Sequence, residues 1–149
     1  MDTPYLRTLQ DFTVGRVFDH QPHKTVIESD NNLFCLLTFN HNPLHSDVEY
    51  AASKPHGRIV VAGTYVFSLA VGLSVPDISG ACIANLEYEK IAHHAPVFIG
   101  DTIRARSVIL NVEPSRSKPD RGVLTVATEV FNQDDRLVLS FRRKVLLPK

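Results

Sequence analysis

Cysteine, net charge and long apolar runs are all scarce in this 149-residue chain, and each shortage excludes a class of protein. The two cysteines, Cys35 and Cys82, lie in apolar runs, which is typical of small buried residues in a reducing compartment and not of a disulfide framework. The formal net charge of zero gives no basis for binding nucleic acid or an anionic membrane surface. It also leaves association between copies of the chain unopposed by charge repulsion.

No apolar run is long enough to predict a membrane span. The longest, Ile59 to Val75, is interrupted by small and polar residues and is followed by Pro76. The first residues, 1–7, are polar and lack an apolar core of signal-peptide length. We therefore expect a cytoplasmic protein with no membrane partner.

The size and composition of the chain predict one domain. A chain of 149 residues, 44% hydrophobic and 21% charged, is long enough for one well-buried core and too short for two ordinary domains. It contains no internal repeat and no low-complexity linker. We expect a single domain over residues 1–149.

The first third of the chain predicts short elements. Two β-rich pieces, Val14–Phe18 and Lys24–Glu28, flank a turn at Gln21-Pro22. A helix is predicted over Asn31–Phe39, and Asp47 is expected to cap a shorter helix that follows. The longer helix is expected to be capped by Ser29 or Asp30 and to bury one apolar stripe, formed by Leu33, Phe34, Leu36 and Leu37.

The rest of the chain predicts one buried helix followed by a sheet. Gly63–Val75 is apolar on every side, which is typical of a helix buried all round. Four segments with partial alternation then predict long antiparallel strands, the last two joined by a hairpin turn at Gln133–Arg136. These strands are Ile83–Ile91, Asp101–Val112, Gly122–Phe131 and Leu137–Leu147. We expect an α+β fold with one antiparallel sheet around one helix.

A polar cluster between the two halves is the candidate functional segment. Thr38–Asp47 contains Asn40, Asn42-Pro43 and His45, and a glycine-opened apolar helix follows it. By themselves, Asn42-Pro43 would stop a helix and His45 would be a hydrogen-bonded turn residue. Polar loops next to the start of a buried helix are also where binding and catalytic sites are commonly mounted.

The residues 40–45 resemble the Gly-Asp-x-Asn-Pro-Leu-His signature of the MaoC-like (R)-specific enoyl-CoA hydratases. The chain departs from that signature with Phe39 in place of glycine and Asn40 in place of aspartate. The likeness extends from Phe12 to Leu147 and includes Pro96–Thr102, a segment similar to the strand entry of many hot-dog proteins. It implies a hot-dog fold, in which a curled antiparallel sheet wraps around a long central helix, and assembly as a homodimer or a higher homo-oligomer.

Within that family the chain is most similar to short hydratases of methyl-branched dicarboxylic acyl-CoAs, such as itaconyl-CoA or mesaconyl-CoA. The resemblance implies that His45 is the base that takes a proton from water, a role suited to an imidazole near neutral pH. It also implies that the backbone N–H of Gly63, next to Val61 and Ala62, holds the thioester oxygen. CoA is then part of the substrate, and neither a cofactor nor a metal is expected. A metal bound by His41, His45 and an aspartate is disfavoured because a proline separates the two histidines.

Asn40 leaves the catalytic mechanism open, because an amide can orient water but cannot exchange a proton at neutral pH. His45 alone can carry out both proton transfers, another group such as His41 or Asp47 can supply one, or the protein can bind acyl-CoA without turning it over. A thioesterase on the same fold is a further alternative. It would need a base that activates water at the thioester carbonyl.

Several basic residues have both a structural and a functional interpretation. Arg58, Arg116 and Arg121 are candidates for binding a distal carboxylate of the acyl group, although the latter two also fit turn residues. Arg142–Lys144 is expected to be a solvated strand face, with contact to CoA phosphates as the alternative. Four further histidines are expected at the surface or at an interface: His20, His23, His93 and His94.

Overall fold

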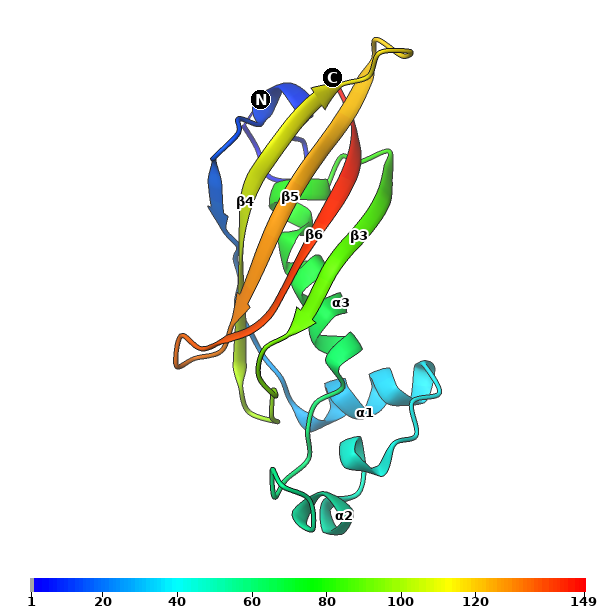
Figure 1. Cartoon of the computed structure of the whole chain (residues 1–149), viewed down its shortest axis with the longest axis vertical. Coiled ribbons are helices and arrows are strands. Elements are labelled where there is room, and N and C mark those ends of the chain that lie inside the picture. Colours follow the sequence, from blue (N-terminus) through cyan, green and yellow to red (C-terminus); the bar gives the residue numbers. More distant parts are fainter. Residues whose placement is uncertain (1) are drawn as a thin grey trace.

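The computed structural model describes residues 2–149 and contains one curled antiparallel sheet in the order β1-β4-β5-β6-β3, with β2 paired to β4. Figure 1 shows this sheet wrapped around α3, while α1 and α2 lie beyond the beginning of that helix. The strands are β1 Val17–Asp19, β2 Lys24–Thr25, β3 Ala84–His93, β4 Thr102–Pro114, β5 Arg121–Phe131 and β6 Leu137–Pro148. The helices are η1 Leu9–Asp11, α1 Glu28–Leu37, η2 Pro43–His45, α2 Val48–Ala52, α3 Gly63–Ser74 and the π-helical η3 Val75–Ser79.

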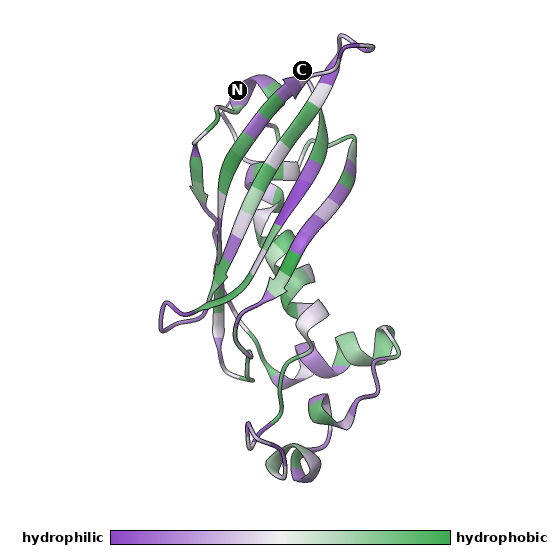
Figure 2. Cartoon of the chain, in the orientation of Figure 1, coloured by the Kyte–Doolittle hydropathy of each residue, from purple (hydrophilic) through white to green (hydrophobic). Residues whose placement is uncertain are grey.

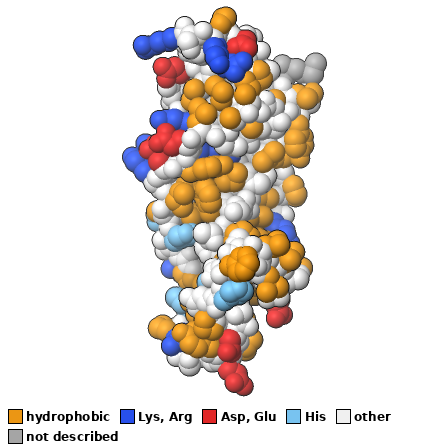
Figure 3. Space-filling model, turned by 90° about the vertical axis from the view of Figure 1, so that its right-hand side faces the viewer, with side chains coloured by type: hydrophobic (Ala, Val, Ile, Leu, Met, Phe, Trp, Pro, Cys, Tyr) orange, Lys and Arg blue, Asp and Glu red, His pale blue; other side chains and the backbone are white. Residues whose placement is uncertain are grey.

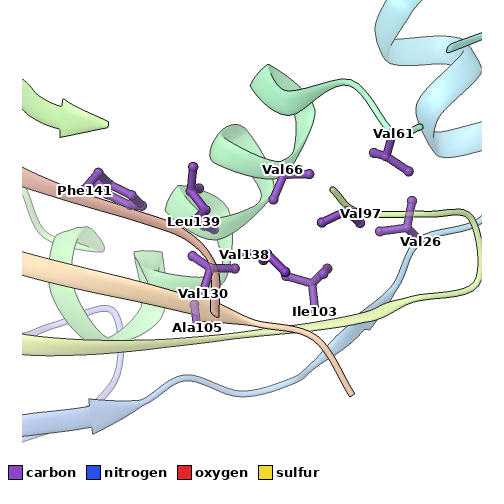
Figure 4. Close-up of a cluster of buried hydrophobic side chains, with 11 residues drawn as sticks. Val26, Val61, Val66, Val97, Ile103, Ala105, Val130, Val138, Leu139 and Phe141 are labelled. Carbon is purple, nitrogen blue, oxygen red and sulfur yellow. The ribbon is translucent and has the colours of Figure 1, made fainter. Parts of the chain in front are cut away.

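The predicted α+β layout is confirmed, and the four long strands begin and end within two residues of their predicted bounds. Alternating burial along β4 and β5 follows the period of two in the sequence. Figure 4 shows one of two buried clusters, in which Val66 of α3 packs toward strand residues such as Ile103 and Leu139. This packing fixes α3 against the concave face of the sheet.

The expectation that α3 is buried on all sides is wrong for this chain. Val66, Ala70 and Ser74 are buried, whereas Thr64, Ser68 and Gly72 are exposed at four-residue intervals. That spacing places the exposed residues on one face of the helix. The sheet covers the opposite face and leaves this small-residue face open (Figures 1 and 2).

The expected stripe of α1 is also wrong, because its buried residues are Asn31 and Cys35. The helix begins at Glu28, and Asp30 lies in its first turn, where its carboxylate accepts the N–H of Ile27 at 3.0 Å. The apolar side chains of the predicted stripe are mostly exposed: Leu33 is 58%, Leu36 56% and Leu37 71% exposed. The hydrogen bonds that Asn31 makes to the neighbouring loops determine which face of α1 is buried.

The solvated strand face predicted for Arg142–Lys144 is wrong at its centre. Arg143 is buried and donates from Nη2 to the hydroxyl of Ser74 at 2.9 Å, beneath the end of α3. Strand alternation places Arg143 on the same inner face as Phe141. Burial lowers the pKa of Arg143 below its usual value.

Other local predictions are confirmed. Asp47 caps α2 by accepting the N–H of Tyr50 at 2.9 Å. Both cysteines are free; Cys35 is buried and Cys82 is half-buried. In residues 2–149, no helix is both long enough and apolar enough to cross a membrane.

Candidate functional site

A cavity of about 360 Å³ lies at the beginning of α3, where the η2 segment, the loop before α3 and the end of β3 meet. Four histidines line it: His45, His56, His93 and His94. The remaining lining residues are glycine or apolar, and no carboxylate contributes to the lining formed by residues 2–149. The cavity therefore offers imidazoles and backbone groups as its polar chemistry.

The chain holds His45 in one orientation. Asn42 accepts the N–H of Leu44 at 3.0 Å, and Pro43 begins the short helical turn that ends at His45. Nδ1 of His45 lies 2.6 Å from the carbonyl oxygen of Val60. Because a carbonyl can only accept, Nδ1 carries the proton, and Nε2 of the neutral ring is left as a proton acceptor.

Asn31, a residue that was not predicted from the sequence, supports this arrangement from behind. The side chain is only 2% exposed. Its Nδ2 donates to the carbonyl oxygen of His45 at 3.0 Å, and its Oδ1 accepts the N–H of Ala62 at 2.9 Å. Asn31 thus joins the base-bearing turn to the start of α3. Asn31 lies among the polar residues of the first half of α1, so no signal in the sequence distinguished it.

The structure brings Gly63 and His45 to the same cavity, as predicted. Val61 also lines it, but its N–H donates to the carbonyl oxygen of Val97 at 2.8 Å, and the N–H of Ala62 is bound by Asn31. Gly63 is the first residue of α3, and the N–H groups of a first helical turn have no acceptor within the helix. Of these three backbone groups, the N–H of Gly63 is therefore the donor available to a ligand.

Asn40 does not reach the cavity in this chain. Its backbone N–H donates to the carbonyl oxygen of Cys35 at 3.0 Å, and its Oδ1 accepts the N–H of Asn42 at 3.5 Å. The residue is half-buried at the turn after α1. Its observed contacts are those of a turn residue, and its catalytic role stays a prediction.

The three candidate arginines lie in different places. Arg121 pairs with Asp120 at the turn between β4 and β5, with two N–O distances of 2.9 Å, and Arg116 lies in the same turn. Figure 1 shows this turn at the end of the molecule opposite α1 and α2. Arg58 is near the cavity, and its guanidinium carbon lies 3.6 Å from the centroid of the Phe98 ring. Of the three arginines, Arg58 is therefore the one that lies near enough to the cavity to be a candidate for binding a distal carboxylate within the same chain.

The surface or interface positions expected for four histidines are confirmed for His23, His93 and His94, which are exposed, and wrong for His20. His93 and His94 line the cavity, although both are exposed. His20 is 1% exposed, and its ring nitrogens lie 2.8 Å from a carboxylate oxygen of Asp77 and 2.8 Å from the hydroxyl of Ser107. The hydrogen-bond partners of His20 and His94 are distant in sequence, so the sequence could not place these two rings.

The group formed by Asp77, His20 and Ser107 has the residue types of a hydrolytic triad. Ser107 is fully buried, however, and its hydroxyl lies 2.8 Å from the hydroxyl of Thr128. Burial lowers the pKa of His20, and the hydrogen bond to Asp77 opposes that shift. Because no substrate can reach a fully buried hydroxyl, this network stabilises the contact between strands and η3 and does not form an active site.

The matches to known proteins establish the family. Residues 10–131 match the MaoC like domain, so the chain belongs to the MaoC-like domain family. The chain is 33% identical over its full length to a mesaconyl-CoA hydratase from Cereibacter sphaeroides and covers 43% of that relative. It therefore spans less than half the length of this curated relative. In residues 2–149 no three or more His, Cys, Asp or Glu side chains are placed so that they could hold a metal ion.

Solved structures have the same fold. A monoamine oxidase regulatory protein from Archaeoglobus is 31% identical with a TM-score of 0.84, and the match covers 96% of this chain and 95% of that one. A Mycobacterium tuberculosis protein described as a double hot-dog fold has a TM-score of 0.84 at 24% identity. That match covers 95% of this chain and 44% of the other, and it supports the fold alone. The predicted hot-dog fold is confirmed.

Proposed function

We propose that this protein adds water across the double bond of an α,β-unsaturated acyl-CoA, and catalyses the reverse dehydration. The observation that carries the proposal is the placement of His45 and Gly63 on one cavity, with Nδ1 of the imidazole fixed by a carbonyl 2.6 Å away. This leaves Nε2 as a base beside an available backbone donor. Family membership and the similarity to a mesaconyl-CoA hydratase support the same reaction.

In this mechanism, Nε2 of His45 takes a proton from water as the water oxygen bonds to the β-carbon. The electron pair of the double bond moves toward the thioester oxygen, which accepts the N–H of Gly63 at the positive end of α3. The imidazolium of His45 then returns the proton to the α-carbon. Atoms and charge balance with one base, so the mechanism does not require a carboxylate at position 40.

The proposed substrate is a methyl-branched dicarboxylic acyl-CoA of the mesaconyl-CoA or itaconyl-CoA type. The 33% identity to a mesaconyl-CoA hydratase supports this choice. Arg58 supplies a cation near the cavity, and its stacking on Phe98 leaves its forked donors free to bind a carboxylate. Arg116 and Arg121 are too far along the sheet to contribute from the same chain.

The proposed assembly is a homodimer in the cytoplasm. Figure 3 shows apolar side chains spread over the face of the molecule where the sheet leaves α3 uncovered. Strand β3 is an edge of the sheet, where Leu86 is 51% and Ile91 45% exposed, and the open face of α3 lies next to it. Relatives of about twice the length, one described as a double hot-dog fold, are consistent with a second copy covering this face. Two free cysteines fit a reducing compartment.

The test is to incubate the wild-type protein with mesaconyl-CoA, itaconyl-CoA and crotonyl-CoA while following the enoyl-thioester absorbance and, in parallel, free thiol. We expect absorbance to fall without thiol release. Loss of a charged hydrogen bond costs about 1.5–3 kcal/mol, so kcat/KM should favour a dicarboxylic substrate over crotonyl-CoA by more than roughly tenfold. Equal activity on crotonyl-CoA would contradict the assignment of a dicarboxylic substrate but not the proposed hydration.

The second candidate function is binding of acyl-CoA without turnover. The turn-like contacts of Asn40 and the similarity to a monoamine oxidase regulatory protein from Archaeoglobus favour it. It predicts saturable binding of the same thioesters with no change in absorbance. Thiol release would instead identify a thioesterase, a reaction for which the cavity offers no carboxylate to activate water.

A further inference from the structure

A bulge in β3 turns His93 toward α3. Tyr88 and Phe141 lie on the inner face of the sheet, where the Tyr88 ring contacts Phe67 with centroids 5.2 Å apart. His93 lies five residues after Tyr88, so regular alternation would point it to the opposite face. The strand instead carries a register shift between Glu89 and Ala92, and Lys90 has a φ of 52°.

The shift inserts one residue and reverses the alternation. After it, His93 pairs with Leu139, a fully buried residue of the inner face. Paired residues of antiparallel strands share a face, so His93 points inward. Bulges commonly re-aim side chains next to active sites, and here the positive φ of Lys90 makes the change.

The imidazole of His93 lies against Gly63. A Cβ placed on Gly63 would lie 2.7 Å from Cε1 of His93, 3.0 Å from its Nε2 and 3.3 Å from its Nδ1. The edge of the ring that carries both nitrogens therefore faces the residue whose N–H is available to a ligand. No side-chain hydrogen bond or ion pair of His93 is found within residues 2–149, and the ring is exposed to the cavity.

The other two histidines of the lining are held by other groups. Nε2 of His94 lies 2.7 Å from the hydroxyl of Ser140, and the ring of His56 packs against Phe98 with centroids 5.9 Å apart. Nδ1 of His45 is bound by a carbonyl. Among the four imidazoles, His93 alone combines a place beside Gly63 with ring nitrogens open to a ligand.

We propose that His93 is a further catalytic residue whose ring N–H donates to the thioester oxygen together with the backbone N–H of Gly63. The inference rests on the proposed hydration, in which negative charge develops on that oxygen as water adds to the β-carbon. His93 moves no proton to carbon: the proton taken by His45 returns to the α-carbon, and the reaction stays balanced. A second donor strengthens stabilisation of the enolate where the cavity offers no other polar side chain beside Gly63.

The kinetic test compares His93→Leu with His93→Gln on the substrate that the wild-type enzyme hydrates fastest. Removal of one oxyanion donor lowers kcat by about a hundredfold or more, so we expect that loss in His93→Leu with KM changed less than about threefold. Gln keeps an N–H donor and should retain several-fold more activity than Leu. His23→Leu, an exposed histidine outside the cavity, is the control.

A binding measurement separates this inference from the proposed reaction. Crotonyl-CoA labelled with carbon-13 at the thioester carbonyl is bound to His45→Ala and to His45→Ala/His93→Leu, neither of which should turn it over. Donation by His93 predicts a downfield carbonyl resonance in the first complex and a smaller shift in the second. Equal shifts in both complexes, or unchanged kcat in His93→Leu, would overturn the role of His93 even if hydration by His45 stands. Absence of hydration in the wild-type enzyme would instead refute the proposed reaction.

Discussion

At the scale of single residues, the candidate site depends on a few specific contacts. His45 is fixed by one carbonyl, Asn31 holds the turn behind it, and Gly63 leaves room for the ring of His93. Each of these contacts joins segments that are distant in sequence. A substitution at Gly63 should therefore affect mainly catalysis, whereas one at Asn31 should affect both folding and catalysis.

Gly63→Ala should lower turnover with little loss of stability. The new methyl group would lie 2.7 Å from Cε1 of His93, so the ring must move. Because His93 is exposed, it can move without disturbing the core, and we expect a change of less than about 1 kcal/mol in the free energy of unfolding. We expect kcat to fall at least roughly tenfold, since one oxyanion donor is displaced. Paired urea unfolding and steady-state kinetics check this, and wild-type kcat in the variant would place the thioester oxygen elsewhere.

Asn31→Leu should lower both stability and activity. It leaves the carbonyl of His45 and the N–H of Ala62 without their partner, and two buried unsatisfied groups cost about 2–4 kcal/mol. Asn32→Ala, on the exposed side of the same helix, is the control for stability. Urea unfolding gives the cost, and a loss no larger than in the control would mean that Asn31 does not join the two segments.

At the scale of elements, the sequence predicted the sheet far better than the site. Alternation over long strands located β4, β5 and β6 within two residues, because one buried face imposes a period of two. The buried face of α1 was not predictable, because the polar contacts of Asn31 and not hydrophobicity determine it. The inward direction of His93 was equally hidden, since one inserted residue at Lys90 reverses it.

The network between η3 and the strands predicts a pH dependence of stability. Burial holds the pKa of His20 below its usual value of 6.5, so the folded state keeps the ring neutral while the unfolded state binds a proton. The contribution of His20 to the free energy of unfolding is at its full value above about pH 6.5 and decreases as the pH falls below that value. His20→Gln should flatten this part of the curve, whereas His23→Gln should not. Urea unfolding at about pH 7.5 and pH 5.5 measures both, and identical slopes in wild type and His20→Gln would contradict the account.

At the scale of the whole molecule, the motif identified the family and predicted the base, but one chain shows only part of the expected assembly. The open face of α3 and the edge strand β3 are surfaces that a second copy of the chain would cover. That second copy was predicted only from the resemblance to the family. An apolar helix is predicted to be fully buried whether the sheet or a second copy of the chain covers its remaining face. The sequence therefore could not distinguish these two cases.

Ser68→Arg should prevent dimerisation. Ser68 lies at the centre of the exposed face of α3, where a long charged side chain would hold a second backbone away. The matched control is Ser117→Arg in the turn between β4 and β5. Light scattering after size exclusion should give a dimer for wild type and the control and a monomer for Ser68→Arg. A dimeric Ser68→Arg protein would place the interface on another surface.

In the proposed reaction, His45 activates water for addition to an enoyl-CoA. The most direct measurement is the rate of enoyl-thioester absorbance loss with mesaconyl-CoA, for wild type and for folded His45→Ala at equal substrate saturation. General base catalysis contributes about 100-fold or more, so the variant should be slower by at least that factor. A folded His45→Ala protein that hydrates mesaconyl-CoA at the wild-type rate would contradict the account.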